Sequence, residues 1–339
     1  MGRDNKKYFK DIHQQVYERL NDMSAYGESK KEAIKNGTDK DKIFSYNTYK
    51  TYYKHCKYFL EYLKVKHPEV TTMKKARKYV NEWLDYRASQ GLSAWTIQTE
   101  AKALGKLYGI GPEDPDYYEP PKRRREDIKR SRGHAKRDKH FSEKNNQELV
   151  DFCCGTGLRA SELEQLRGGD IVSAAQLKAR LDKLNAKESL TETDKKSIQI
   201  IKDAMIFGET ENFVFVRKGK GGRQRLSPII GPQEEQIVKR IRETPKGEKV
   251  WEYVNRNADI HNYRAVYAGN IYKKYRRDPK DIPYDKVNKG TGKRYQSEVY
   301  VCRKDEHGRR LDRAAMLKCS KALGHNRVEV VANNYLRGE

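Results

Sequence analysis

A proline-rich segment followed by a strongly basic one divides the chain and constrains its fold more than any other feature. Residues 111–121 hold four prolines, and residues 122–140 hold ten Lys or Arg against three acidic residues. Proline is excluded from helix interiors because it lacks a backbone N–H and its ring clashes with the preceding turn. We therefore expect an interdomain linker at 112–140, with a folded unit on either side.

The residues before the linker show the apolar spacing of helices. From Tyr46 onwards, tyrosine, phenylalanine and leucine residues recur at intervals of three and four, and Ser93 precedes another such repeat as its expected N-cap. This pattern predicts a helical bundle at 41–111. We expect an N-terminal basic helical arm at 1–40 in front of it.

The residues after the linker show a mixed pattern. The segment NFVFV at 212–216 is strand-like, and a glycine-rich turn joins it to a second β-rich run that ends at Pro228, which predicts a hairpin. Helix-forming segments surround it, including 173–205, where we expect two helices. The predicted fold class is multidomain: α before the linker, and mixed α/β at 141–339, mainly helical with a small antiparallel sheet.

The charge of the chain predicts a polyanionic partner. There are 72 Lys or Arg and 48 Asp or Glu, a formal net charge of +24. A membrane surface is the less favoured partner because we find no lipidation motif or anchor, and no apolar stretch of the roughly 18 residues that cross a bilayer. We expect nucleic acid instead, and a cytoplasmic protein because the first residues lack the apolar core of a signal peptide.

Neither cysteine nor histidine has the spacing of metal ligands. The five cysteines form no CxxC pair, and the eight histidines form no HExxH motif. We expect buried thiols, no metal and no cofactor.

The basic part of the linker has two interpretations. Its local charge of +7 is typical either of a solvated, disordered connection or of a segment that crosses a DNA backbone and orders there. The candidate DNA-binding residues are Lys122, Arg123, Arg124, Arg125, Lys129, Arg130 and Arg132, together with Arg223 in the hairpin.

Four short motifs follow one another after the linker. They are TGLRASEL at 156–163, GKGGRQRLSPI at 219–229, HNYR at 261–264, and LGH followed by a tyrosine within 323–335. In this order they resemble the motifs of the tyrosine recombinase (phage integrase) family, and the resemblance runs from about Tyr46 to the C-terminus. It implies a helical core-binding (SAM-like) domain followed by a tyrosine-recombinase catalytic domain, closing as a clamp around duplex DNA.

The resemblance implies roles for the first two motifs. Arg159 would bind the scissile phosphate, since a guanidinium offers paired donors that match two phosphate oxygens. The alternative is an arginine that is salt-bridged to Glu162 or Glu164 on a helix surface. Lys220 would protonate the departing 5′ oxygen, and the nearby Lys218 is the other candidate.

The third motif is short, and the sequence contains three His-x-x-Arg pairs. The pair at 134–137 precedes Arg159, against the family's order, and the pair at 307–310 runs directly into the last motif. We therefore favour His261 and Arg264, which the resemblance assigns to proton transfer and a second phosphate contact.

The last motif contains the expected nucleophile. The resemblance implies that His325 hydrogen-bonds a phosphate oxygen and that Tyr335 attacks the phosphorus; the alternative is a tyrosine packed near the chain end. A phenol, with an ordinary pKa of about 10, needs a base and a cationic pocket to act as a nucleophile. The predicted catalytic cations and histidines supply both, without a metal ion.

Two segments depart from the family's pattern. Residues 173–205 and 278–308 are interpreted as insertions, and four residues follow Tyr335. Because many relatives use a longer C-terminal helix to contact a neighbouring protomer, we expect one of the insertions to make that contact.

The function implied is site-specific recombination of the integrase type, through a 3′-phosphotyrosine intermediate, for a phage or conjugative element. The partners implied are double-stranded DNA with inverted-repeat core sites, three further copies in a tetramer, and an accessory DNA-bending or excision factor. Three alternatives stay open: a chromosome or plasmid dimer-resolving recombinase, a type IB topoisomerase, and a non-catalytic DNA-binding regulator.

Overall fold

The computed structural model describes residues 10–124, 140–282, 298–303, 306–325 and 327–336. It divides into two compact units, Met1–Lys129 and Arg130–Glu339, so the border falls within the basic segment. Among the described residues, no helix is both long and apolar enough to cross a membrane.

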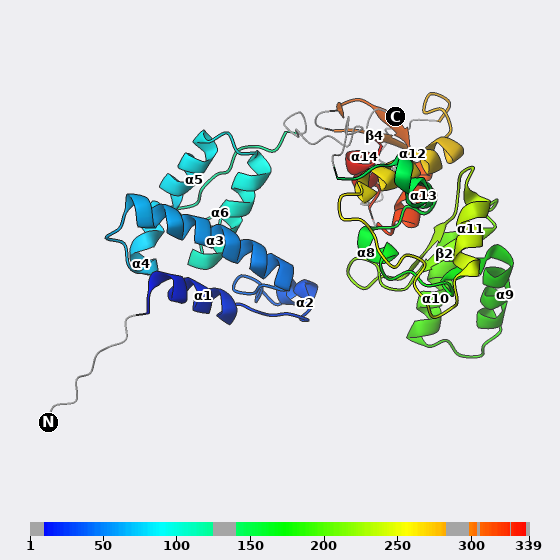
Figure 1. The fold of residues 1–339 in the computed structure, drawn as a ribbon, viewed down its shortest axis with the longest axis horizontal. Coiled ribbons are helices and arrows are strands. Elements are labelled where there is room, and N and C mark those ends of the chain that lie inside the picture. Colours follow the sequence, from blue (N-terminus) through cyan, green and yellow to red (C-terminus); the bar gives the residue numbers. More distant parts are fainter. Residues whose placement is uncertain (1–9, 125–139, 283–297, 304–305, 326, 337–339) are drawn as a thin grey trace, which may run out of the picture. The chain divides into compact units, whose positions relative to one another are not determined.

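The first unit is a helical bundle (Figure 1). Its helices are α1 (Ile12–Asp22), α2 (Lys30–Lys35), α3 (Tyr46–Lys66), α4 (Met73–Ala76), α5 (Val80–Ser89) and α6 (Ala94–Tyr108), with a 3₁₀ turn at Arg77–Tyr79 between α4 and α5. The expected cap of α6 is present, because the Ser93 side chain accepts a hydrogen bond from the Thr96 N–H.

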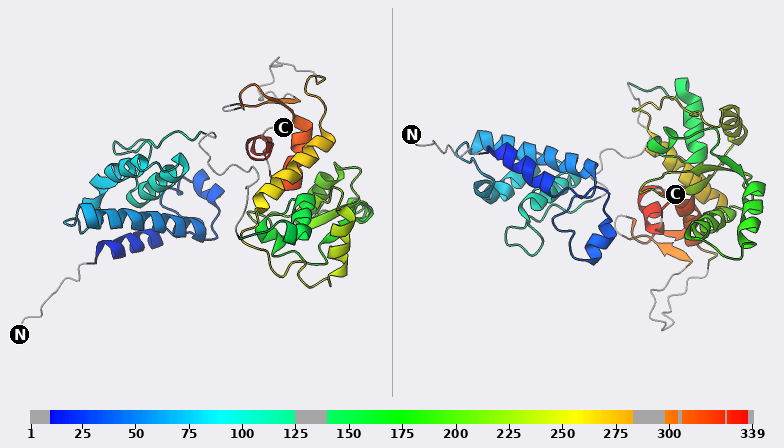
Figure 2. Two further views of the ribbon diagram at one scale, coloured as in Figure 1. Left: turned by 45° about the horizontal axis from the view of Figure 1, so that its top comes forward. Right: turned by 90° about the horizontal axis from the view of Figure 1, so that it is seen from below.

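Over its described part, the expected N-terminal arm belongs to this bundle. Val16 and Leu20 of α1 are fully buried in the same core as Phe59 and Leu60 of α3. The two helices lie side by side in both Figure 1 and Figure 2. The apolar stripe of an amphipathic helix needs a surface to cover it, so the stripe on α1 packs on α3 and the border at residue 40 separates no second core.

The second unit is mixed α/β and mainly helical, as its sequence pattern predicts. Its helices are α7 (Gln147–Thr156), α8 (Ala160–Leu163), α9 (Ala174–Asn185), α10 (Glu192–Met205), α11 (Glu234–Glu243), α12 (Ile260–Tyr275), α13 (Arg313–Leu323) and α14 (Val328–Asn334), and a 3₁₀ turn at Lys144–Asn146 precedes α7.

The strands of the second unit form two small antiparallel sheets. One has the order β1 (Ile171–Ser173), β2 (Asn212–Val216) and β3 (Arg225–Pro228), and the other pairs β4 (Val299–Val301) with β5 (Arg310–Asp312). The predicted hairpin is β2 with β3, in which Phe215 lies opposite Leu226.

The segment 173–205 forms the two expected helices, α9 and α10, between β1 and β2. Thr191 caps α10 by a reciprocal pair of hydrogen bonds with Asp194. Ile201 and Ala204 of α10 are buried in the core that also contains α12 and α13, so this helix pair is an integral layer of the unit. Of the segment 278–308, residues 283–297 and 304–305 lie outside the described residues.

Helix α12 joins the two cores of the second unit. Tyr263 belongs to the core around α7 and α11, whereas Tyr267 and Ile271 belong to the core around α10 and α13. Because α12 is held on both sides, Arg264 between these tyrosines occupies a rigid position in the unit's interior.

Candidate active site

A tight connection between α7 and α8 positions Arg159. Gly157 follows the last residue of α7 with a φ of +59°, and a Cβ there would clash with the Tyr267 ring. Glycine is therefore required at this position both for its backbone conformation and for space. Two residues later, Arg159 is the N-cap residue of α8.

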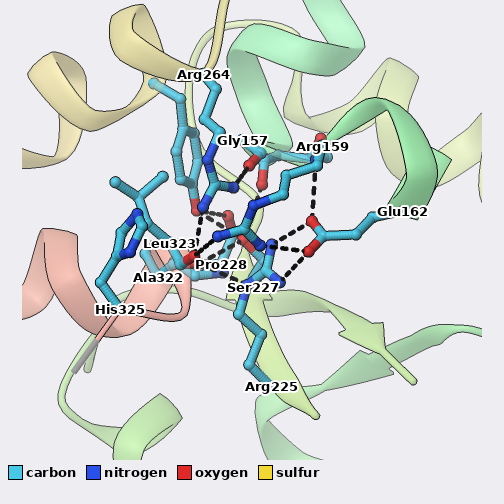
Figure 3. Close-up of polar contacts among 12 residues, drawn as sticks. Gly157, Arg159, Glu162, Arg225, Ser227, Pro228, Arg264, Ala322, Leu323 and His325 are labelled. Atoms are coloured by element: carbon cyan, nitrogen blue, oxygen red, sulfur yellow. Dashed lines mark hydrogen bonds and ion pairs between the residues drawn. The ribbon is translucent and has the colours of Figure 1, made fainter. Parts of the chain in front are cut away.

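A buried carboxylate pairs with two arginines (Figure 3). Arg159 donates to Glu162 at 2.6 Å, and Arg225 of β3 donates to both Glu162 oxygens at 2.8 Å each. Burial alone would raise the pKa of Glu162, but the hydrogen bonds and positive charge of Arg225 and Arg159 outweigh it and lower that pKa to about 2. Glu162 therefore stays ionised and orients both guanidinium groups.

The contact between Arg159 and Glu162 is the one raised in the alternative interpretation, but its setting differs from a helix surface. The Arg159 side chain is 21% exposed and Glu162 is buried. Arg159 also donates to the Leu323 carbonyl at the end of α13, at 3.3 Å. The arginine therefore lies between two elements that are 164 residues apart in the sequence.

Arg264 of α12 lies deepest in the cluster, with 1% of its surface exposed. It donates to the carbonyls of Gly157 and Leu323, and its Nε lies 3.4 Å from the Tyr335 hydroxyl. Burial, followed by the nearby charges of Arg225 and Arg159, lowers the pKa of Arg264 to about 10. The guanidinium remains charged at neutral pH, close to two other cations.

Tyr335 follows α14, and its hydroxyl faces this cluster. His325, directly after α13, places Nε2 at 3.3 Å from the Tyr335 hydroxyl. The exposed His261 packs edge-on to the Tyr335 ring, with 6.0 Å between ring centroids. Of the three His-x-x-Arg pairs, the favoured one is thus brought to the tyrosine, while 134–137 lies outside the described residues.

The His325 side chain has an unusual electrostatic environment. Burial lowers its pKa, and the positive charges of Arg264, Arg159, Arg225 and Lys220 lower it further, to about 4. At neutral pH the imidazole is therefore uncharged, so one of its ring nitrogens is free of a proton and can accept one.

The hairpin lysines line different pockets. Lys220 and Arg223 line a pocket together with Arg159 and His325. Lys218 instead lines a separate groove that contains Asp170. The geometry therefore separates the two candidates that the sequence left open and brings Lys220 to the cluster.

Of the seven DNA-binding candidates in the linker, three belong to the described residues. Lys122, Arg123 and Arg124 are exposed, and the Arg123 guanidinium lies 5.6 Å from the centroid of the Trp95 ring. The remaining four, Arg125, Lys129, Arg130 and Arg132, lie outside the described residues.

Sequence reasoning missed Arg225 and a lysine–aspartate pair. Arg225 is 7% exposed and lies opposite the buried Val216 in the hairpin; an arginine at a buried strand position is the signal that a carboxylate partner exists. Lys321 of α13 binds Asp203 of α10 at 2.8 Å, and both line the pocket of Lys220. Nothing in the local sequence joins those two.

The chemistry of the cluster follows from its charges. Glu162 pairs with Arg159 and Arg225, whereas Arg264 donates to two backbone carbonyls and to the Tyr335 hydroxyl. Three guanidinium groups are therefore set against one paired carboxylate among the described residues. The surplus is two positive charges beside a phenol and an uncharged imidazole, which suits a phosphate diester that gains negative charge as it reacts. No group of three or more His, Cys, Asp or Glu suited to a metal ion occurs in the part of the chain that the structure describes.

No protein-family model matches the chain, and no curated protein matches its sequence. The candidate site is therefore defined by its own geometry.

Proposed function

We propose that the protein is a tyrosine-type site-specific DNA recombinase, which cuts and rejoins duplex DNA through a 3′-phosphotyrosine intermediate. The observation that carries the proposal is the position of the Tyr335 hydroxyl, 3.3 Å from His325 and 3.4 Å from Arg264, beside surplus positive charge. The order of the four sequence motifs supports the same reading.

The first step is attack of the Tyr335 oxygen on the phosphorus. We assign acceptance of the phenolic proton to His325 and not to His261, to which the resemblance gives proton transfer, because His325 Nε2 lies 3.3 Å from the Tyr335 hydroxyl whereas His261 packs edge-on to the ring. The uncharged state of His325 at neutral pH is required for this role. The oxygen–phosphorus bond forms as the bond from phosphorus to the 5′ oxygen breaks, and Lys220 protonates that leaving oxygen. Arg159 and Arg264 donate to the non-bridging oxygens, where charge develops in the transition state.

The second step reverses the first on another strand. The phosphotyrosine is itself a phosphodiester, so a 5′-hydroxyl from a partner strand attacks it, and the phenol leaves. The bond count is unchanged, so rejoining needs no ATP. The roles exchange, with Lys220 accepting the proton of the attacking hydroxyl and His325 returning one to Tyr335.

We further propose that the substrate is duplex DNA with inverted-repeat core sites, bound by a tetramer, and that the reaction serves integration and excision of a phage or conjugative element. This finer assignment rests on the resemblance of the motifs. The charge of +24 supports a DNA partner.

Replacing Tyr335 with Phe tests the chemistry, because it removes the oxygen that would attack and leaves the ring. The substrates are nicked duplexes made from the DNA that flanks the gene, where an attachment repeat is expected. Wild type should form a protein–DNA adduct that survives SDS, whereas Tyr335→Phe should form none and bind the same DNA with near-normal affinity. Tyr253→Phe is the matched control, since Tyr253 is 70% exposed and belongs to the same unit.

Three other outcomes would contradict the proposal. An adduct with Tyr335→Phe refutes this nucleophile. Relaxation of supercoiled DNA that lacks the flanking repeat indicates a type IB topoisomerase. Binding without an adduct on any substrate indicates a DNA-binding regulator.

A further inference from the structure

A continuous row of tyrosine rings lies on the first unit, which contributes nothing to the chemistry above. Tyr46, Tyr49 and Tyr53 follow one face of α3, as their spacing of three and four requires. Their rings are nearly parallel, with centroid separations of 6.2 Å and 6.0 Å and interplanar angles of 10° and 9°. Tyr26 extends the row at one end, 6.1 Å from Tyr46, and Tyr17 of α1 at the other, 6.0 Å from Tyr53.

Most tyrosines of this row are not explained by packing in the core of the bundle. Tyr49 is buried, but the exposed fractions of Tyr46, Tyr26 and Tyr17 are 60%, 46% and 43%. Exposed aromatic side chains gathered on one surface are typical of a binding site, because each leaves apolar area in water until a ligand covers it.

Three lysines give this surface its charge. Lys50, Lys54 and Lys57 are exposed and line the groove formed by the tyrosines, against a single acidic residue, Glu61. The Lys50 Nζ lies 5.6 Å from the centroid of the Tyr46 ring. The surface, which we call the tyrosine–lysine face, comprises Tyr17, Tyr26, Tyr46, Tyr49, Tyr53, Lys50, Lys54 and Lys57.

A ligand that fits must combine negative charge with flat apolar rings. An acidic peptide satisfies the lysines but not the ring faces. Duplex DNA supplies phosphates, but its bases are stacked on one another and present only their edges. A single strand offers both a phosphate backbone and unstacked bases, and aromatic side chains alongside lysines are how proteins hold such strands.

We propose that the tyrosine–lysine face binds unpaired nucleotides of a single DNA strand, with bases stacked on Tyr46 and Tyr26 and phosphates held by Lys50 and Lys54. This binding is independent of covalent chemistry, so it is tested in protein that carries Tyr335→Phe. Failure of the proposed recombinase reaction leaves the proposal intact, and the reverse also holds.

The test separates stacking from charge by means of two oligonucleotides with equal numbers of phosphates. One is a fluorescein-labelled strand of 12 thymidines, and the other has abasic sugars in place of the thymidines. Fluorescence anisotropy should show at least about tenfold tighter binding of the thymidine strand, because each base stacked on Tyr46 or Tyr26 strengthens binding by about fivefold or more. The double variant Tyr26→Leu/Tyr46→Leu should bind both strands with the affinity of the abasic one.

Two variants serve as controls. Tyr253→Leu, which removes an exposed tyrosine from the second unit, should keep the tenfold difference. Lys50→Ala/Lys54→Ala should weaken binding of both strands equally. Circular dichroism establishes that each variant is folded. Because Tyr46 and Tyr26 are exposed, their replacement by leucine should leave the fold intact.

Three results would overturn the proposal. Equal affinity of the wild type for the thymidine and abasic strands means that no base stacks on the protein. A tenfold difference that survives in Tyr26→Leu/Tyr46→Leu places the stacking site elsewhere. Preference for a 12-base-pair duplex, lost in the same variant, assigns the face to the backbone of double-stranded DNA instead.

Discussion

The two units of the chain present positive charge in opposite ways. In the second unit, Arg264 and Arg225 are buried and hold backbone carbonyls or Glu162. In the first, Lys50 and Lys54 stand exposed on α3 beside tyrosine rings. Buried guanidinium groups keep a single geometry, which catalysis of phosphoryl transfer requires. Exposed lysines keep their rotamer freedom and can follow a flexible strand. Charge alone therefore does not define the role of a site, whereas burial and anchoring do.

The largest expected effect comes from breaking the anchor of the buried arginines. Glu162→Gln removes the carboxylate that Arg159 and Arg225 share, and leaves a buried Arg225 without a counter-charge. We expect the free energy of unfolding of the second unit to fall by about 3–5 kcal/mol, measured by urea denaturation. Glu164→Gln is the matched control, since Glu164 is exposed two residues away and should change stability by less than about 0.5 kcal/mol. Equal effects of the two variants would mean that the pair does not anchor the site.

A smaller effect, on the salt dependence of DNA binding, is expected when exposed lysines are removed from the first unit. The double variant Lys50→Ala/Lys54→Ala removes two contacts to strand phosphates, each of which releases about 0.7 counterions on binding. In Tyr335→Phe protein, the slope of log affinity against log salt should therefore decrease by about 1.4 for the thymidine strand. A slope unchanged from that of the parent protein would show that these lysines do not contact phosphates. Binding titrations at salt concentrations from about 50 to 200 mM measure this slope.

A further expected effect is a difference in acid sensitivity. The pKa of folded His325 is lowered to about 4, below the ordinary value of about 6.5 for an unfolded histidine. Between these values the unfolded chain binds the extra proton, so the second unit should lose stability as pH falls from about 6.5 to 4. In the first unit, burial would raise the pKa of Glu100, but the nearby His55 and the hydrogen-bonded Arg87 outweigh burial and lower that pKa. The stability that Glu100 contributes should be lost only below about pH 4.3.

Hydrogen exchange read by mass spectrometry follows both units in one experiment. Between pH 6.5 and 4.5, protection should decline in the second unit earlier than in the first, after correction for intrinsic exchange rates. His325→Gln should remove part of that decline, and His307→Gln, at an exposed position, should not. Identical profiles for the two variants would contradict the assignment to His325.

Local features of the fold followed from the sequence because their causes are local. The Ser93 cap, the hairpin at 212–228 and the break between α9 and α10 each depend on residues within a few positions of one another. The packing of α1 on α3 did not follow, since an apolar stripe predicts that a helix needs a partner but not which surface it covers.

The candidate site divides in the same way. The motifs singled out Arg159, Arg264, His325 and Tyr335 one by one, and their proposed roles stay predictions. Arg225 and the Lys321–Asp203 pair escaped notice because each acts through a partner that is distant in the sequence. Glu162 was considered only as a partner of Arg159, because its contact with Arg225 spans 63 positions. The sequence left open whether Lys218 or Lys220 belongs to the candidate site, because both lie in one hairpin turn. Their neighbours differ only in the folded chain, where the two lysines line different pockets.

The sequence by itself determined the helical first half, the mixed second half, the basic segment between them and the residue types available for chemistry, because periodicity, turn residues and charge are properties of neighbouring positions. Only the tertiary structure decided that Arg159 and Arg225 share the Glu162 carboxylate and that Arg264 lies beside the Tyr335 hydroxyl. It alone also decided that tyrosines of α1 and α3 form one row with lysines. These arrangements join residues up to 164 positions apart, and such contacts arise from packing of the whole chain, which no local pattern encodes.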